Sequence, residues 1–336
     1  MIDSWIEKKI GTALSRSALT DYQLARLRDT ISRAQSCSPF FSSCLSGIDV
    51  GRELSCLADL ALLPLMDDSD LIRSGGDMLC VPASGVSRIV TLPTSGTTGT
   101  PKRVYFTEAD QELMIDYIHH GLALMADPGD LFLTLMPCER PGSVGDLVCR
   151  GVERRGVRAL PYGLLPADGS KDEELLSLIS DEGVTQILAT ASTAVRLASK
   201  SAKCTESIGL KSILLSAEYV SSEARAYIEN VWDCLVYEHY GMTEMGLGGA
   251  MACGTRTGYH PREADILFEI IDPKTGEVLP DGEWGEVVFT TLTREAMPFI
   301  RYRTGDISRF IPEPCPCGSI LKRLDRVRDR ALMKGY

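Results

Sequence analysis

The chain lacks the features of several large protein classes. A membrane-spanning helix needs about 20 apolar residues, and no apolar run in the chain approaches that length. Residues 1–23 lack the apolar centre of a secretion signal. Its 35 lysines and arginines form no run and are outnumbered by 46 aspartates and glutamates, which gives a net charge of -11. An acidic surface of this kind argues against nucleic acid and anionic membrane as partners. We therefore expect a cytoplasmic globular protein that binds neither.

Histidine is scarce, with four residues, whereas there are eleven cysteines. Because cytoplasmic thiols stay reduced, these cysteines predict no disulfide framework. Eight of them stand singly among apolar or small residues and are expected to be ordinary small hydrophobic side chains.

The pattern of apolar residues changes twice along the chain. Residues 1–88 are mainly helical in pattern, with Thr20 and Gln23 as a capping box and a polar loop at 73–76. Residues 89–245 alternate strands and helices, which is typical of a mostly parallel sheet in an α/β protein. Residues 246–330 predict a small antiparallel β subdomain, with tight turns at 272–276 and 280–282. The expected strands are 88–92, 131–136, 157–161, 186–189, 213–215, 235–237, 266–271, 287–291 and 307–311, and the expected helices after 88 begin at Thr107, Lys171 and Ser221 or Ser222.

A loop rich in glycine, serine and threonine follows the first of these strands. Residues 93–102 read Pro-Thr-Ser-Gly-Thr-Thr-Gly-Thr-Pro-Lys. Its two glycines let backbone amides approach an anion, its hydroxyl groups can donate hydrogen bonds, and Lys102 supplies a point charge suited to phosphate. The loop is not a Walker A motif, because Lys102 follows Pro101. By composition alone, it could equally be a flexible surface loop.

Two further strings combine residue types that suit a nucleotide and its metal ion. Residues 240–244 read Tyr-Gly-Met-Thr-Glu, and residues 301–306 read Arg-Tyr-Arg-Thr-Gly-Asp. Carboxylate oxygens suit Mg²⁺, an aromatic ring offers a flat face to a base, and a carboxylate accepts two hydrogen bonds from a vicinal diol. Taken singly, either string could be an ordinary turn or a solvated charge cluster.

Together, in this order, the three strings resemble the motifs of the adenylate-forming superfamily, which includes acyl-CoA synthetases, peptide-synthetase adenylation domains and luciferases. The resemblance implies the large N-terminal α/β domain of such an enzyme, with ATP or AMP and Mg²⁺ as cofactors. It implies that Thr243, Glu244 and Lys102 are catalytic, with Glu244 on Mg²⁺ and Thr243 on the α-phosphate. The implied nucleotide contacts are Thr94, Ser95, Gly96, Thr97, Thr98, Gly99, Glu218, Glu238, Tyr240, Gly241, Met242 and Asp306.

The segment from Gly285 to Pro298, with Cys315-Pro-Cys-Gly, looks like the phenylacetate–coenzyme A ligase branch. That branch activates aryl and arylacetic acids, which makes a small carboxylic acid the expected substrate. CoA, another small molecule or a carrier protein is the implied acyl acceptor. The implied reaction is attack of the carboxylate on the α-phosphate, with pyrophosphate leaving and no side-chain nucleophile required. Residues 137–145 and 216–219 are candidates for the acid pocket, or are plain loops.

Cys253, His260, Cys315 and Cys317 form a candidate zinc site. Three thiolates and one imidazole make a tetrahedral Zn²⁺ set, which would be structural because it leaves no open position. The spacing is not that of a zinc finger, and buried free thiols are the alternative.

In the superfamily a small C-terminal domain follows a hinge, and we expect this chain to lack it. Adenylation would then be slow without a partner that supplies the missing cation, and thioester formation weaker still. Two rival hypotheses share this expectation: a nucleotide-binding regulatory or scaffold protein with little turnover, and one half of a split ligase whose small domain is a separate chain.

Overall fold

A computed structural model describes residues 2–92, 101–203 and 208–328. Within these residues the chain forms two units. The first contains residues 113–241 and 251–259, and the second contains residues 2–112, 242–250 and 260–328. No described helix is both long enough and apolar enough to cross a bilayer.

A parallel sheet forms the centre of the first unit. Its strands lie in the order β4-β3-β5-β6-β7, and every neighbouring pair runs parallel. The fold class predicted from the alternating pattern is therefore confirmed. The bounds are β3 (Leu131–Thr134), β4 (Arg158–Pro161), β5 (Gln186–Ala189), β6 (Ser212–Leu215) and β7 (Leu235–Tyr240), and the sheet continues in β8 (Ala250–Ala252) and β9 (Tyr259–Pro261).

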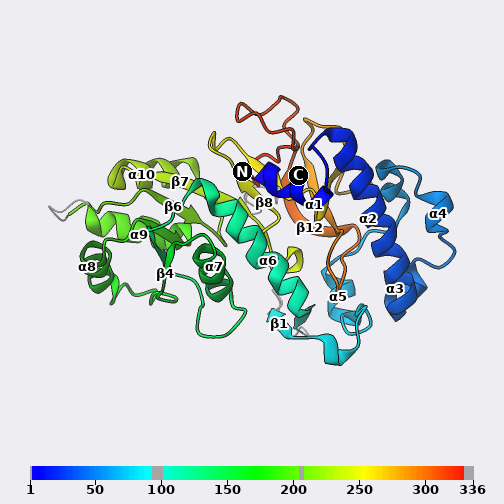
Figure 1. Ribbon diagram of the computed structural model, residues 1–336, viewed down its shortest axis with the longest axis horizontal. Helices are drawn as coiled ribbons and strands as arrows, with labels where there is room; N and C mark the ends of the chain where they lie inside the picture. The colour runs from blue at the N-terminus through cyan, green and yellow to red at the C-terminus, as the bar shows by residue number, and fades with distance from the viewer. Residues whose placement is uncertain (1, 93–100, 204–207, 329–336) are drawn as a thin grey trace. The chain divides into compact units, whose positions relative to one another are not determined.

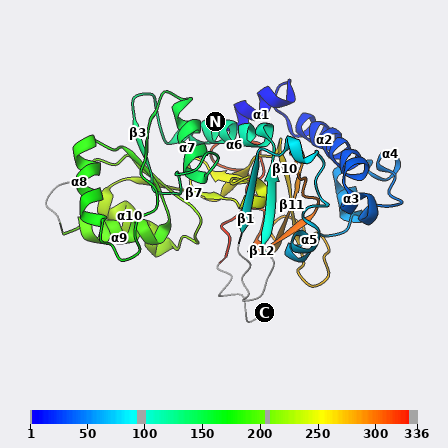
Figure 2. The same ribbon diagram turned by 90° about the horizontal axis from the view of Figure 1, so that it is seen from below.

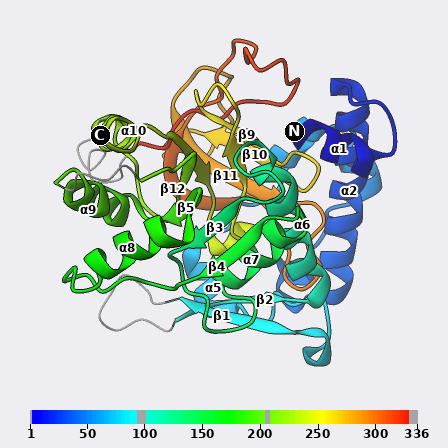
Figure 3. The ribbon, with the colours of Figure 1, turned by 60° about the vertical axis from the view of Figure 1, so that its left-hand side comes forward.

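Helices cover both faces of this sheet (Figures 1 and 3). One face packs against α8 (Asp172–Glu182), α9 (Ala191–Ser201) and α10 (Ser222–Trp232) through a continuous buried core of leucine, isoleucine, valine and alanine. The opposite face carries α7 (Val144–Glu153), whose Cys149 thiol lies 3.6 Å from the Thr134 hydroxyl on β3. Because both faces are covered, every residue of the central strands β3, β5 and β6 is buried, rather than every second one.

The predicted starts of two helices are confirmed. The hydroxyl of Ser221 accepts the backbone N–H of Ala224 at the start of α10. At the start of α6 (Glu108–Gly121), the Thr107 hydroxyl accepts the N–H of Asp110, and the Asp110 carboxylate accepts the N–H of Thr107. These reciprocal bonds satisfy amides that the first helical turn leaves without partners.

The second unit combines N-terminal helices with two antiparallel sheets (Figure 2). One sheet pairs β10, β11 and β12, and its core is a buried cluster of Phe289, Phe299 and Tyr302 with ring centroids 5.0–5.8 Å apart. The other is a hairpin of β1 and β2. The bounds are β1 (Arg88–Leu92), β2 (Lys102–Phe106), β10 (Ile266–Ile271), β11 (Gly285–Thr291), β12 (Tyr302–Ser308), α1 (Ile2–Ile10), α2 (Arg16–Cys37), α3 (Pro39–Cys44), α4 (Val50–Glu53) and α5 (Asp68–Ser74), with short 3₁₀ turns η1 (Leu57–Leu62), η2 (Ala83–Gly85) and η4 (Thr243–Met245). A further 3₁₀ turn, η3 (Leu122–Leu124), belongs to the first unit.

Three local predictions were wrong. The long helix α2 begins at Arg16 with Ser15 as its cap, so Thr20 and Gln23 lie inside it and form no capping box. Instead, Gln23 is buried and donates to the carbonyl of Glu263 at 2.8 Å. The loop predicted at 73–76 begins only at Gly75, because Arg73 and Ser74 end helix α5. The strand expected at 307–311 is β12, which begins five residues earlier, at Tyr302, and ends at Ser308.

Candidate functional site

The glycine-rich string joins the two strands of the β1–β2 hairpin. Leu92 pairs with Lys102 across the hairpin, which fixes the two ends of the string opposite each other. The predicted phosphate-binding residues Thr94, Ser95, Gly96, Thr97, Thr98 and Gly99 lie outside the described residues. Lys102 is described, and it begins β2.

The Lys102 ammonium contacts two carboxylates. Its Nζ lies 2.9 Å from Oε1 of Glu244 and 2.9 Å from Oδ1 of Asp68. Glu244 is buried within η4, and Asp68 begins helix α5. Burial opposes the charged form of Lys102, but the two carboxylates outweigh it, so the pKa of the ammonium is raised above its ordinary value. Lys102 therefore stays a cation beside a buried carboxylate.

The same cluster contains a residue that the sequence pattern did not single out. The Tyr302 hydroxyl donates to the Asp68 carboxylate. Burial together with nearby carboxylates raises the pKa of the Tyr302 hydroxyl. Asp68 and Tyr302 lie 234 residues apart, so no local pattern could have paired them. Two carboxylates facing one ammonium form a donor set of the kind that suits Mg²⁺.

Asp306 lies on β12, where a bulge interrupts the pairing with β11. The Glu286 carboxylate accepts the N–H of Gly305, and the Thr304 hydroxyl accepts the N–H of Asp306 at 3.0 Å. These bonds fix the backbone around the half-buried Asp306 side chain. Its predicted role on the ribose stays a prediction.

The other predicted nucleotide residues lie at the end of β7 or just after β6 and β7, at the carboxyl edge of the sheet where open α/β sheets bind ligands. Glu238 is buried, and burial raises its pKa against the opposing effects of Arg225 and the Tyr259 hydroxyl, which donates to it at 3.2 Å. The ring of Tyr240 stacks on Tyr259 with centroids 6.5 Å apart.

Glu218 has a helix-capping role in the structure. Its carboxylate accepts both the N–H and the hydroxyl of Ser192 at 2.8 Å, at the start of α9. The turn before it is sharp, because Ala217 adopts a positive φ of 66°. Gly241 follows β7, and Met242 is the extended residue that caps η4, which contains Thr243. Contacts of these residues with a nucleotide remain predictions.

A half-buried histidine next to this turn escaped the sequence analysis. His239 Nε2 lies 2.6 Å from the Ser216 hydroxyl, and burial lowers the pKa of the imidazole to about 4. The ring is therefore neutral at physiological pH. Leu215 of β6 pairs with Glu238 of β7. The residues that follow them, Ser216 and His239, therefore lie at the same edge of the sheet.

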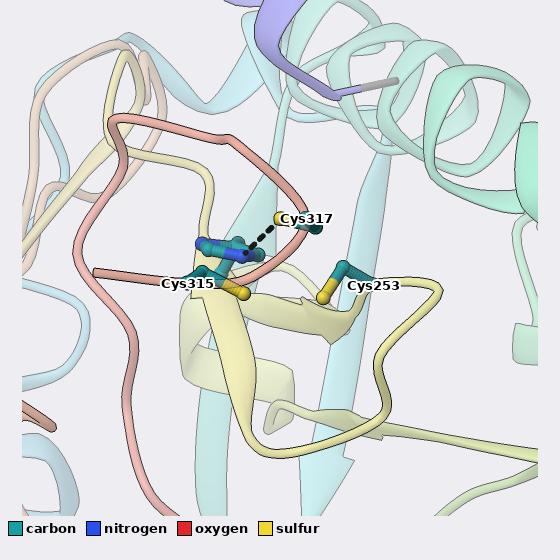
Figure 4. A group of neighbouring side chains, drawn as sticks. Cys253, Cys315 and Cys317 are labelled. Atoms are coloured by element: carbon teal, nitrogen blue, oxygen red, sulfur yellow. Dashed lines mark hydrogen bonds between the residues drawn. The ribbon is translucent and has the colours of Figure 1, made fainter. Parts of the chain in front are cut away.

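The predicted metal ligands come together. The ligand atoms of Cys253, His260, Cys315 and Cys317 all lie within 4.8 Å of one another (Figure 4). His260 Nε2 is 3.3 Å from the Cys317 sulfur, and its Nδ1 lies 3.0 Å from the carbonyl of Lys322. A bond from Nδ1–H to a carbonyl orients the ring and directs Nε2 at the thiols, as in metal sites. Three sulfurs and one nitrogen fit a tetrahedral metal ion.

The chain resembles known proteins in both sequence and fold. The profile of the AMP-binding enzyme family matches residues 81–292. Phenylacetate-coenzyme A ligase of Pseudomonas putida is 33% identical over 96% of this chain and 73% of its own length, and that of Thermus thermophilus is 32% identical over the same shares. A crystal structure of 2-hydroxyisobutyryl-CoA ligase is 25% identical, with a TM-score of 0.85 over 94% of this chain and 69% of that protein. The chain therefore belongs to the AMP-binding family of adenylate-forming enzymes, on its phenylacetate–coenzyme A ligase-like side.

Proposed function

We propose that the protein activates an aryl or arylacetic acid with ATP, forming the acyl-adenylate and releasing pyrophosphate. The observation that carries the proposal is the buried Glu244 carboxylate held 2.9 Å from the Lys102 ammonium, at the start of the strand that follows the glycine-rich string. This pair places a potential metal ligand beside a cation suited to phosphate.

In the proposed mechanism the acid's carboxylate attacks the α-phosphorus while the bond to pyrophosphate breaks. Residues 94–102 would hold the β- and γ-phosphates, and the Thr243 hydroxyl would donate to the α-phosphate. Mg²⁺ bound at Glu244 would neutralise charge developing on the phosphate oxygens. Asp306 would bind the ribose hydroxyls, so that binding energy from the nucleoside positions the reacting centre.

The acid would bind near residues 137–145 and 216–219. The first segment is an ordered turn, in which the N–H of Gly145 donates to the carbonyl of Pro137 at 2.8 Å and the N–H of Gly142 donates to Asp146 at 2.6 Å. The neutral His239 beside Ser216 adds hydrogen-bonding capacity without charge. This favours acids whose side chain is uncharged, and hydroxy-substituted acids belong among those tested.

We also propose that Zn²⁺ binds Cys253, His260, Cys315 and Cys317 in a structural role, because four protein ligands leave no position for a substrate. We propose cytoplasmic localisation, which suits the reduced thiols that such a site needs.

ATP–pyrophosphate exchange across a panel of aryl, arylacetic and aliphatic acids tests the proposed reaction. Exchange with an aryl or arylacetic acid that disappears in Glu244→Gln would support it. ATP binding with no exchange for any acid would instead favour the regulatory nucleotide-binding hypothesis. The same preparations, given CoA and preformed acyl-adenylate, report whether the acyl group proceeds to a thioester.

A further inference from the structure

The segment between β11 and β12 contains a buried arginine that the proposed reaction does not use. Arg294 is 4% exposed, and its guanidinium donates to two backbone carbonyls. Nη1 donates to the carbonyl of Glu244 at 2.6 Å, and Nη2 donates to the carbonyl of Tyr105 at 3.1 Å. Tyr105 lies on β2, the strand that Lys102 begins. One side chain thus joins the two elements that supply the Lys102–Glu244 pair.

The guanidinium is held in place on its other sides. Its Cζ lies 4.2 Å from the centre of the Phe106 ring and 5.2 Å from that of Phe299. Burial lowers the pKa of Arg294 to about 10, with Asp110 acting in the opposite direction, so the group remains a cation at neutral pH. A planar cation between aromatic rings, with donors on two edges, is a geometry that lysine cannot reproduce.

The backbone next to Arg294 is also fixed. The Asp110 carboxylate accepts the N–H of Glu295 at 2.7 Å and the N–H of Ala296 at 3.0 Å. Asp110 belongs to the first turn of α6, which follows β2 directly. The arginine is therefore anchored at its backbone as well as at its guanidinium.

The element that Arg294 holds is short. Glu244 lies in a single 3₁₀ turn, and Met242, the residue that precedes the turn, provides no side-chain cap. A second buried arginine, Arg262, donates to the next carbonyl, that of Met245. Two cations bound to consecutive carbonyls compensate for the small number of hydrogen bonds that such a short turn makes by itself.

We infer that Arg294 is a positioning residue, which sets the Glu244 carboxylate at its distance from Lys102 and so prepares the turn for a metal–nucleotide complex. The inference rests on the proposed function. It assigns no contact between Arg294 and the substrate. Its effect acts through the backbone of Glu244 and the strand that contains Lys102.

Two substitutions separate the parts of this role. Arg294→Lys keeps the charge but can reach only one of the two carbonyls, whereas Arg294→Met keeps much of the volume and loses both bonds. Arg301→Met is the matched control. Arg301 is 3% exposed and donates to the carbonyls of Ala61 and Leu63, 2.9 and 2.8 Å away, but not to that of Glu244. It also pairs with the Glu269 carboxylate at 3.1 Å, so its loss should cost at least as much stability as the loss of Arg294.

The first readout is binding of ATP as a function of Mg²⁺ concentration, measured by calorimetry on folded protein, and it needs no turnover. We expect Arg294→Met to require about tenfold more Mg²⁺ for the same ATP affinity, and Arg294→Lys to fall between it and the native protein. Arg301→Met should lower the Tm and leave the Mg²⁺ dependence unchanged. In the exchange assay, kcat should fall in the order native, Lys and Met, while the KM for the acid stays constant.

Equal Mg²⁺ dependence in Arg294→Met and the native protein would overturn the inference, as would an equal shift in Arg301→Met. Failure of the proposed function has a different signature: the native protein would then exchange no pyrophosphate with any acid. The calorimetric comparison would still report on Arg294 in that case. If Arg294→Met does not fold, the comparison of Arg294→Lys with the native protein decides.

Discussion

The Lys102 ammonium and the Glu244 carboxylate lie 2.9 Å apart, although 142 residues separate them in the chain. Glu244 is 2% exposed, whereas the Lys102 side chain is 13% exposed, so the carboxylate has far less access to water than its partner. A buried carboxylate depends strongly on its cation, because removal of one partner leaves an uncompensated charge.

A double-mutant cycle at this pair separates its roles in stability and in catalysis. Lys102→Met should lower the free energy of unfolding by roughly 3 kcal/mol, because it leaves Glu244 buried without its ammonium. The double variant Lys102→Met, Glu244→Met should regain most of that stability, since two apolar side chains replace the ion pair. Pyrophosphate exchange should stay absent in both. Denaturant unfolding and the exchange assay measure the two effects, and a double variant as unstable as the single one would contradict the argument.

The neutral state of His239 predicts a specific dependence of stability on pH. The pKa falls from 6.5 to about 4 on burial, so the unfolded chain binds more protons than the native protein between these values. The contribution of His239 to the free energy of unfolding is therefore fully present above pH 6.5 and is lost as the pH falls towards 4. The loss should amount to about 3 kcal/mol.

His239→Gln isolates that contribution, because glutamine can still bond to Ser216 but does not titrate in this range. The difference in unfolding free energy between the native protein and the variant should shrink as the pH is lowered from 7 to 4. A difference that is constant with pH would show that the imidazole is not the group responsible.

The periodicity of the sequence predicted the parallel sheet because buried strands such as 186–189 are short, apolar and separated by helices. It failed where a tertiary contact decided the outcome. Gln23 looked like a helix cap, yet its amide is buried against the carbonyl of Glu263, 240 residues away. The strand at Tyr302 began earlier than expected, because its glycine and charged residues are held by Glu286 and Thr304.

In the candidate site, too, local sequence strings could be interpreted but long-range contacts could not. Lys102 and Glu244 could be predicted because each lies in a short string with a recognisable chemistry. Asp68, Tyr302 and Arg294 could not, since their importance comes from long-range contacts. Asp68 contacts Lys102, Tyr302 donates to Asp68, and Arg294 donates to the carbonyl of Glu244. His239 lay beside a predicted residue, but its burial and its contact with Ser216 exist only once β6 and β7 pair.

Gly285 begins the segment that resembles the phenylacetate–coenzyme A ligase branch. The backbone of the neighbouring strand leaves no room for a side chain at this position. A Cβ at this position would lie 2.3 Å from the carbonyl oxygen of Ile271 on the paired strand β10. Because backbone cannot yield as a side-chain tip does, Gly285→Ala should cost about 3 kcal/mol or more in denaturant unfolding. A Cβ at Gly209 would meet nothing within 4 Å, so Gly209→Ala serves as the control and should change stability little. Equal effects of the two substitutions would contradict this interpretation.

The cysteine–histidine group predicts one tightly bound zinc ion per chain. Protein purified without chelator should contain it by elemental analysis, and removal with a strong chelator should lower the Tm by about 5 °C or more, because metal binding adds to the free energy of folding. Cys317→Ser should lose the metal, since it removes one of the four ligands. Retention should also weaken in acid, where protons compete for the thiolates and the imidazole.

Cys234→Ala is the matched control for this prediction. Cys234 is also buried, and burial raises the pKa of its thiol to about 12, so it stays protonated and is a poor metal ligand. The variant should lose some stability from its cavity and yet keep a full complement of zinc. Native protein that is free of metal and insensitive to chelator, or a Cys317→Ser variant that keeps all its zinc, would show that these four side chains are ordinary buried groups.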